Sequence, residues 1–303
     1  MKSYSKKVML ANLTISVWNA RRLDKRATDE VAKNHNEAIP IGRYNKKLLP
    51  GEVKSYEKVC KLGSALRDFH YTQTMEYDQL GVRLLPAGIY MDYTAKLREL
   101  QRDFDTAVEE FLADYDNLVA QARVMLNGLF NEGDYPTIET LRGKFGVSLR
   151  VLPFPDAEKF GVVLPEEELA GIRQDIEDQT QEAINNAMGD LWQRLYDVVA
   201  RMSERLAQPN AIFRDSLVEN VREICDLLPQ MNFTEDQDLE NLRKQVDEKL
   251  AIHEPETLRN DPLARNQAAK QAVEIQSMMA AFMGKQVSAF DTPTDDGKQL
   301  SFL

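Results

Sequence analysis

The chain has 303 residues and a formal net charge of −11. This length allows a substantial core in one large or two ordinary domains, so stabilising disulfides are not needed. Cys60 and Cys225 have no CxxC or CxxH neighbour, which argues against a disulfide framework or a zinc site. The start lacks an apolar signal region, and no apolar run approaches the roughly 18 residues of a membrane span. We therefore expect a cytoplasmic protein with no membrane partner.

Charge is unevenly distributed along the chain. Residues 1–70 hold 15 Lys and Arg against 7 Asp and Glu, a net of +8, whereas residues 71–303 hold 23 against 42, a net of −19. Such asymmetry is typical of a polyanion-binding end or of docking between subunits. Mutual neutralisation of the two ends inside one fold is the alternative, and both remain open.

Residues 1–93 are predicted to form a basic α+β portion. Apolar residues alternate with polar ones over residues 8–18, which predicts a half-buried strand. Thr28 is placed to cap a short helix, and apolar spacing predicts a longer helix over residues 52–69. A short extended piece, residues 81–85, precedes a Pro-Gly turn.

Residues 94–207 carry the clearest pattern. From Leu97 to Leu129, and again from Leu169 to Leu206, hydrophobic residues recur at steps of three and four, close to a heptad repeat. Neither stripe is stable in water, so we expect a long, antiparallel, coiled-coil-like helical hairpin.

The tip of this hairpin is assigned to residues 132–165. Thr137 to Lys144 has the composition of a short helix. Apolar alternation at 147–151 and the apolar run 160–164 flank a Pro/Asp turn, which predicts a small β-hairpin.

The C-terminal helices are assigned to residues 208–285 and a flexible tail to residues 286–303. We expect helices over 211–228, over 235–251 with Thr234 as cap, and from Pro262 to about Met283 with Asp261 as cap. The predicted fold is therefore mainly α.

Signals for catalysis are weak. The three histidines form no metal-binding pair, and no phosphate-binding loop, dinucleotide turn or nucleophile elbow occurs. Most carboxylates fall on predicted exposed helix faces, and His70, between Phe69 and Tyr71, is interpreted as structural. We expect no enzyme activity, no cofactor and no metal.

Binding chemistry is better supported, because cations and aromatic residues are interleaved near the N-terminus. Single-stranded nucleic acid needs cations for its phosphates and aromatic faces for its bases. An acidic protein surface, including that of another copy, would satisfy the same cations. The candidate binding residues are Trp18, Arg21, Arg22, Lys25, Arg26, Arg43, Tyr44, Lys46 and Lys47.

Several stretches carry a family resemblance: MLANLTISVWNARRLDKRATDEVAKNHN, GRYNKKLL, RDFHYTQT, LLPAGIYMDY and LWQRLYDVVARMSERLAQPNAIFRDSLVENVREICDLLPQMN. With them the chain resembles, almost to Met283, an uncharacterised family of tailed bacteriophages and prophages, a domain of unknown function. The resemblance supplies no catalytic residues. Genes of this family are found near MoxR-like AAA+ ATPases and von Willebrand A-type proteins, which implies an adaptor or substrate-recognition role beside such a motor in a bacterial host cell.

Two functions follow as expectations. The first is a non-enzymatic phage interaction or assembly protein that forms a homo-oligomer or acts as an adaptor to a AAA+ ATPase. The alternative is a single-stranded nucleic-acid-binding or annealing protein that uses the basic N-terminal segment.

Overall fold

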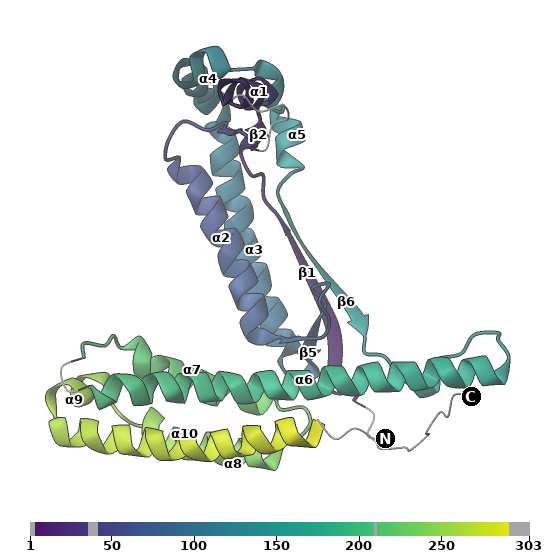
Figure 1. Cartoon of the computed structure of the whole chain (residues 1–303), viewed down its shortest axis with the longest axis vertical. Helices are drawn as coiled ribbons and strands as arrows, with labels where there is room; N and C mark the ends of the chain where they lie inside the picture. Colours follow the sequence, from purple (N-terminus) through teal and green to yellow (C-terminus); the bar gives the residue numbers. More distant parts are fainter. Residues whose placement is uncertain (1–3, 36–41, 209–210, 291–303) are drawn as a thin grey trace. The chain divides into compact units, whose positions relative to one another are not determined.

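The computed structural model describes residues 4–35, 42–208 and 211–290, and these are mainly helical with a small antiparallel sheet. The helices are α1 (Lys25–Asn34), α2 (Lys54–Gln73), α3 (Tyr90–Ala113), α4 (Tyr115–Leu126), α5 (Ile138–Arg142), α6 (Glu166–Ala207), α7 (Ser216–Met231), α8 (Gln237–Val246), α9 (Pro255–Asn260) and α10 (Pro262–Phe290) (Figure 1). The strands are β1 (Val8–Ser16), β2 (Arg21–Leu23), β3 (Asn45–Lys47), β4 (Met75–Glu76), β5 (Arg83–Pro86) and β6 (Gly146–Pro153). The strand order is β4-β5-β1-β6 in one sheet and β2-β3 in a separate ribbon. Within these ranges, every helix is too short or too polar to cross a membrane.

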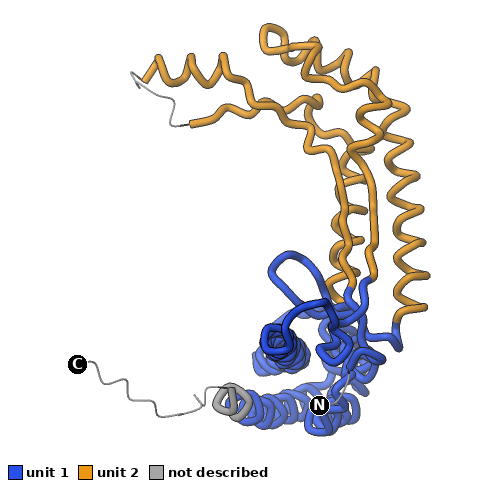
Figure 2. Tube along the Cα trace, turned by 90° about the vertical axis from the view of Figure 1, so that its right-hand side faces the viewer, with its two compact units in different colours: residues 1–10, 73–89, 152–303 blue, residues 11–72, 90–151 orange. Residues whose placement is uncertain are grey.

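The chain divides into two compact units, neither of which is continuous in sequence (Figure 2). Unit 1 comprises residues 1–10, 73–89 and 152–303, and unit 2 comprises residues 11–72 and 90–151. The division therefore does not coincide with the boundaries predicted at residues 93/94 and 207/208. Strands β1 and β6 each contribute residues to both units.

Unit 1 is built around α6, which lies alongside α10 and also packs against α7 (Figure 1). Trp192 of α6 is only 1% exposed and stacks on Phe282 of α10, with 5.7 Å between the ring centroids. The indole Nε1 of Trp192 donates a hydrogen bond to Asp236 Oδ2 at 3.0 Å. A buried indole needs such an acceptor, so this bond fixes the start of α8 against α6.

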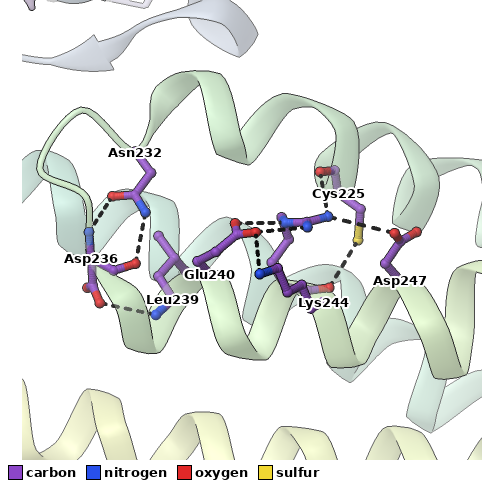
Figure 3. Close-up of polar contacts among 8 residues, drawn as sticks. Cys225, Asn232, Asp236, Leu239, Glu240, Lys244 and Asp247 are labelled. Carbon is purple, nitrogen blue, oxygen red and sulfur yellow. Dashed lines mark hydrogen bonds and ion pairs between the residues drawn. The ribbon is translucent and has the colours of Figure 1, made fainter.

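A polar network holds α8 against α7 (Figure 3). The Arg243 guanidinium donates two hydrogen bonds to Glu240, at 2.9 and 3.0 Å, and a third to the Cys225 carbonyl at 3.3 Å. This arrangement lowers the pKa of Glu240 and raises that of Arg243, chiefly through their shared hydrogen bonds. At the other end of α8, the Asp236 carboxylate accepts from the backbone N–H groups of Asp238 and Leu239 and so caps the helix.

Unit 2 contains α2 and α3, which lie side by side (Figure 1). Gly63 leaves room on α2 for Val17, because a Cβ there would lie 3.3 Å from the Val17 side chain, a tight contact, and 3.6 Å from Phe104 of α3, an ordinary one. Farther along, His70 of α2 is 2% exposed and its Nδ1 lies 2.8 Å from the hydroxyl oxygen of Tyr93. This buried pair links α2 to α3.

Several predicted elements are confirmed. Four predicted elements are present: the strand as β1, the helix over 52–69 as α2, the extended piece before Pro86 as β5 and the short helix near Thr137 to Lys144 as α5. The final helix begins at Pro262 as predicted, with the Asp261 carboxylate accepting from two backbone N–H groups. It continues to Phe290, past the predicted end at Met283. The rest of the predicted tail lies outside the described residues.

The predicted helical hairpin of residues 94–207 is not confirmed. Helices α3 and α6 belong to different units, and the apolar stripe of α6 is covered by α7 and α10. The first stripe is also divided, because the helix is interrupted at Asp114 between α3 and α4. The stripe spacing indicates that each helix needs a partner, but it does not identify the partner.

Two local predictions are wrong. The β-hairpin expected within residues 132–165 is absent, because β6 lies beside β1 in the sheet and residues 160–164 form no strand. The caps of α1 and α8 are also misassigned: Asp24 and Asp236 cap these helices in place of Thr28 and Thr234. Carboxylates and hydroxyls are both good N-cap groups, so the local sequence does not show which of two nearby residues caps the helix.

Candidate interaction surface

The predicted binding residues gather around the two-stranded ribbon β2-β3 of unit 2. The strands are antiparallel, with Arg21 opposite Lys47 and Arg22 opposite Lys46. Because successive residues of a strand point to opposite faces, Arg21 and Lys47 share one face while Arg22 and Lys46 share the other.

The Lys46 face is neutralised by carboxylates of the same unit. Lys46 is 5% exposed, and its Nζ lies 3.1 Å from Asp24 and 2.8 Å from Asp134 and donates to the Leu129 carbonyl at 2.7 Å. Arg22 Nε also lies 3.5 Å from Asp134. Burial by itself lowers the pKa of Lys46, but its hydrogen bonds to the two carboxylates outweigh burial and raise that pKa. Lys46 is therefore a structural cation and does not face a partner.

Asp24 has a second role in the same network. Its Oδ1 accepts the Ala27 backbone N–H at 3.0 Å and so caps α1. This backbone hydrogen bond, followed by the one from Lys46, lowers the pKa of the Asp24 carboxyl. One carboxylate therefore joins the start of α1 to the ribbon.

Trp18 is unsuitable for stacking on a base, because it is 7% exposed and lies in an aromatic cluster. Its ring centroid is 6.4 Å from Tyr56, 6.3 Å from Phe111 and 6.0 Å from Tyr115. Tyr56 Oη donates to the Trp18 carbonyl at 2.5 Å. Burial raises the pKa of Tyr115 to about 12, as expected for an enclosed phenol. The candidate list is therefore corrected: Trp18 and Lys46 belong to the interior of unit 2.

The remaining cations are exposed, and we call them the cationic surface: Arg21, Lys25, Arg26, Arg43 and Lys47. Within the described residues, their side chains form no ion pair or hydrogen bond. Tyr44, beside Arg43, is 43% exposed and is the one candidate aromatic residue that faces solvent. The Asp24 N–H donates to the Tyr44 carbonyl at 2.9 Å, which joins the Arg43 loop to the start of α1.

The cationic surface is electrostatically unfavourable in the isolated chain. Arg21 and Lys47 are like charges directly opposite on paired strands, an arrangement that destabilises a ribbon. Lys25 and Arg26 occupy the first turn of α1, where the positive end of the helix dipole disfavours cations and Asp24, the N-cap, is the acidic group beside them. An anionic partner would relieve both effects.

Sequence reasoning did not identify Asp24 and Asp134 as partners of the cations. Asp24 lies within the basic cluster itself. Its negative charge was the feature of the sequence that could have indicated neutralisation inside the unit. Asp134 is distant in sequence, and no local pattern connects it with Lys46.

Among residues 4–35, 42–208 and 211–290, no group of three His, Cys, Asp or Glu side chains is placed to hold a metal ion. Comparison with known proteins gives no match to a family model, a curated protein or a solved structure.

Proposed function

We propose that this chain is a non-enzymatic interaction protein that uses the cationic surface of unit 2 to bind acidic protein surfaces, first of all those of a second copy. The observation that carries the proposal is the set of five exposed, unpaired cations in a chain of net charge −11. Unit 1 contains 19 Lys and Arg against 31 Asp and Glu, a net of −12, so each copy also supplies an acidic surface.

The contrast between the two faces of the ribbon supports this assignment. On one face of the ribbon, Lys46 and Arg22 are neutralised by the carboxylates of Asp24 and Asp134 in the same unit. Arg21 and Lys47, on the opposite face, receive none. Complementary charge across an interface accelerates association and selects the partner.

A AAA+ ATPase is the second protein partner that we propose. The resemblance to a phage family encoded beside MoxR-like ATPases motivates it, and an acidic face on the motor would meet the same cations. This assignment does not depend on the unconfirmed helical hairpin.

Light scattering over a salt series tests the proposal. We expect a mass above 34.6 kDa at low salt that falls toward this value as salt screens the contact. The same series is run with a MoxR-like AAA+ ATPase. A chain that stays monomeric at every salt concentration and does not bind the ATPase would refute the proposal.

Single-stranded nucleic acid is the second candidate ligand, and exposed Tyr44 beside Arg43 is the observation that favours it. One aromatic face flanked by cations is the minimal stacking unit for a base. The burial of Trp18 and the neutralisation of Lys46 weaken this candidate.

A gel-shift titration with single-stranded DNA over a salt series decides the matter. True phosphate contacts give an affinity that falls steeply with salt, and Tyr44→Ala should weaken binding. Tyr71→Ala is the control, since Tyr71 is 49% exposed on α2. Equal binding by both variants would reject the assigned site.

A further inference from the structure

A second uncompensated basic site lies in unit 1, where α6 ends and α7 begins. A groove of about 330 Å³ is lined there by Arg201, Arg205, Arg214, Ser216 and Asn220, with Phe213 among its apolar residues. The three arginines are exposed, and none has a carboxylate partner or a side-chain hydrogen bond within the described part of the chain. This is unusual for a unit whose net charge is −12.

The arrangement of these arginines is unfavourable without a ligand. Arg201 and Arg205 are four residues apart on α6 and therefore occupy the same face, where like charges repel. Arg214 approaches from the segment before α7 and lines the same groove. Convergence of three guanidinium groups on one groove points to an anion.

Arg265 adds a further positive charge beside the groove. Its guanidinium is buried, and among the described residues its acceptors are neutral carbonyls: those of Arg205 at 3.3 Å, Leu206 at 3.4 Å, Gln208 at 2.6 Å and Ala211 at 3.0 Å. The group also lies 5.5 Å from the centroid of the Phe213 ring. No carboxylate of the described residues pairs with it, so the carbonyl dipoles at the C-terminal end of α6 are what offset its charge.

The first turn of α7 contributes neutral polar groups to the groove. Asp215 precedes this 16-residue helix without capping it through its side chain, and its carboxylate pairs with Arg259 instead. Asp215 and Glu219 therefore place two carboxylates at the positive end of the α7 dipole, so the helix end itself is not the attraction for an anion. The hydroxyl of Ser216 and the amide of Asn220 supply neutral donors in the groove.

We propose that this groove binds a small phosphate-bearing ligand with at least two negative charges. Planar guanidinium groups match phosphate oxygens in bidentate geometry, and three of them suit a multiply charged oxyanion better than a single carboxylate. The volume is at the lower end of the range for small-molecule sites, which suits a ligand of about pyrophosphate to mononucleotide size. This site is separate from the cationic surface of unit 2 and does not depend on the proposed function.

Isothermal titration calorimetry with inorganic pyrophosphate on the full chain tests the proposal. We expect the wild type to bind and the double variant Arg201→Gln/Arg205→Gln to bind about tenfold or more weakly, since charge-assisted hydrogen bonds are lost. Arg98→Gln/Arg102→Gln is the matched control, because these exposed arginines are also four residues apart on a helix, α3. It should bind pyrophosphate as the wild type does, and circular dichroism confirms that both variants fold.

Three outcomes would overturn the proposal. The first is a wild type that binds no pyrophosphate up to millimolar concentration, and the second is equal loss of binding in the groove and control variants. The third is binding of a single-stranded oligonucleotide, but not of pyrophosphate, that depends on Arg201 and Arg205. That result would assign the groove to a nucleic-acid backbone instead of a small ligand.

Discussion

Replacing Lys46 with methionine should destabilise unit 2 much more than the same replacement of its neighbour Lys47. Lys46 is buried and neutralises Asp24 and Asp134, whose side chains are each 11% exposed. Both carboxylates lie within 3.1 Å of the Lys46 Nζ, so they are at most about 6 Å apart. Without the ammonium group, two like charges remain close together and poorly solvated.

The magnitude follows from the contacts that remain. Breaking a buried ion pair by removing one partner costs about 3 to 5 kcal/mol. After the replacement, Asp134 keeps Arg22 at 3.5 Å and Asp24 keeps the Ala27 N–H at 3.0 Å, so we expect the lower end, about 3 kcal/mol. Lys47→Met removes an exposed, unpaired cation and should change the free energy of unfolding by no more than about 0.5 kcal/mol.

Tryptophan fluorescence during urea unfolding isolates the relevant unit, because Trp18 lies in unit 2 and Trp192 in unit 1. With every protein carrying Trp192→Phe, the signal reports the surroundings of Trp18. Adding Asp134→Asn to Lys46→Met should recover part of the loss, since one unpaired carboxylate is removed. Equal midpoints for Lys46→Met and Lys47→Met would refute the assignment of Lys46 as a structural cation.

Further predictions concern pH, thiol reactivity and packing. The pKa of Glu240 is lowered from its ordinary value of 4.5. The ionised Glu240 carboxylate therefore stabilises the fold above pH 4.5, and this stabilisation is lost as pH falls through the lowered pKa of the folded state. The difference in melting temperature between wild type and Glu240→Gln should shrink in acid. Burial raises the pKa of the Cys225 thiol to about 12, so a thiol reagent should label half-buried Cys60 first and Cys225 only on unfolding. Mass spectrometry of the labelled peptides measures the order of labelling. Gly63→Leu should cost about 1 to 3 kcal/mol in urea unfolding, because a Cβ added there would lie only 3.3 Å from the Val17 side chain. Unchanged stability would contradict the close approach of Val17 to α2.

Local patterns in the sequence predict most of the helices because burial follows the 3.6-residue period. Leu97, Phe104 and Phe111 of the first stripe and Leu191 and Leu195 of the second are all buried, as their spacing predicts. The pairing of these helices was not predictable, since a stripe shows that a helix has an apolar face but does not show which helix covers it.

The long-range strand contact is a similar case. Residues 147–151 alternate as a strand should, and β6 forms there, but it lies beside β1 from the far end of the sequence. The local Pro/Asp turn favoured a hairpin because sequence reasoning gives more weight to nearby segments. The pairing of β6 with β1 joins segments that are far apart in sequence, so no local pattern predicts it.

The candidate site was predictable in composition but not in orientation. The sequence places Lys46 and Lys47 side by side, yet one is 5% exposed and ion-paired whereas the other faces solvent. Strand alternation separates them once the ribbon is known, and the ribbon depends on pairing between β2 and β3, which are separated in sequence by residues 24–44. The charge of Asp24 was the one local sign that part of the cluster is neutralised internally.

The most direct test of the central claim is light scattering on a charge-reversed cationic surface. The variant Arg21→Glu/Lys47→Glu is compared at low salt with the wild type and with Arg98→Glu/Arg102→Glu, which makes the same change of charge on α3. We predict that the wild type and the α3 variant exceed 34.6 kDa while the ribbon variant remains at that mass. A ribbon variant that associates as the wild type does would contradict the claim that this surface is the contact.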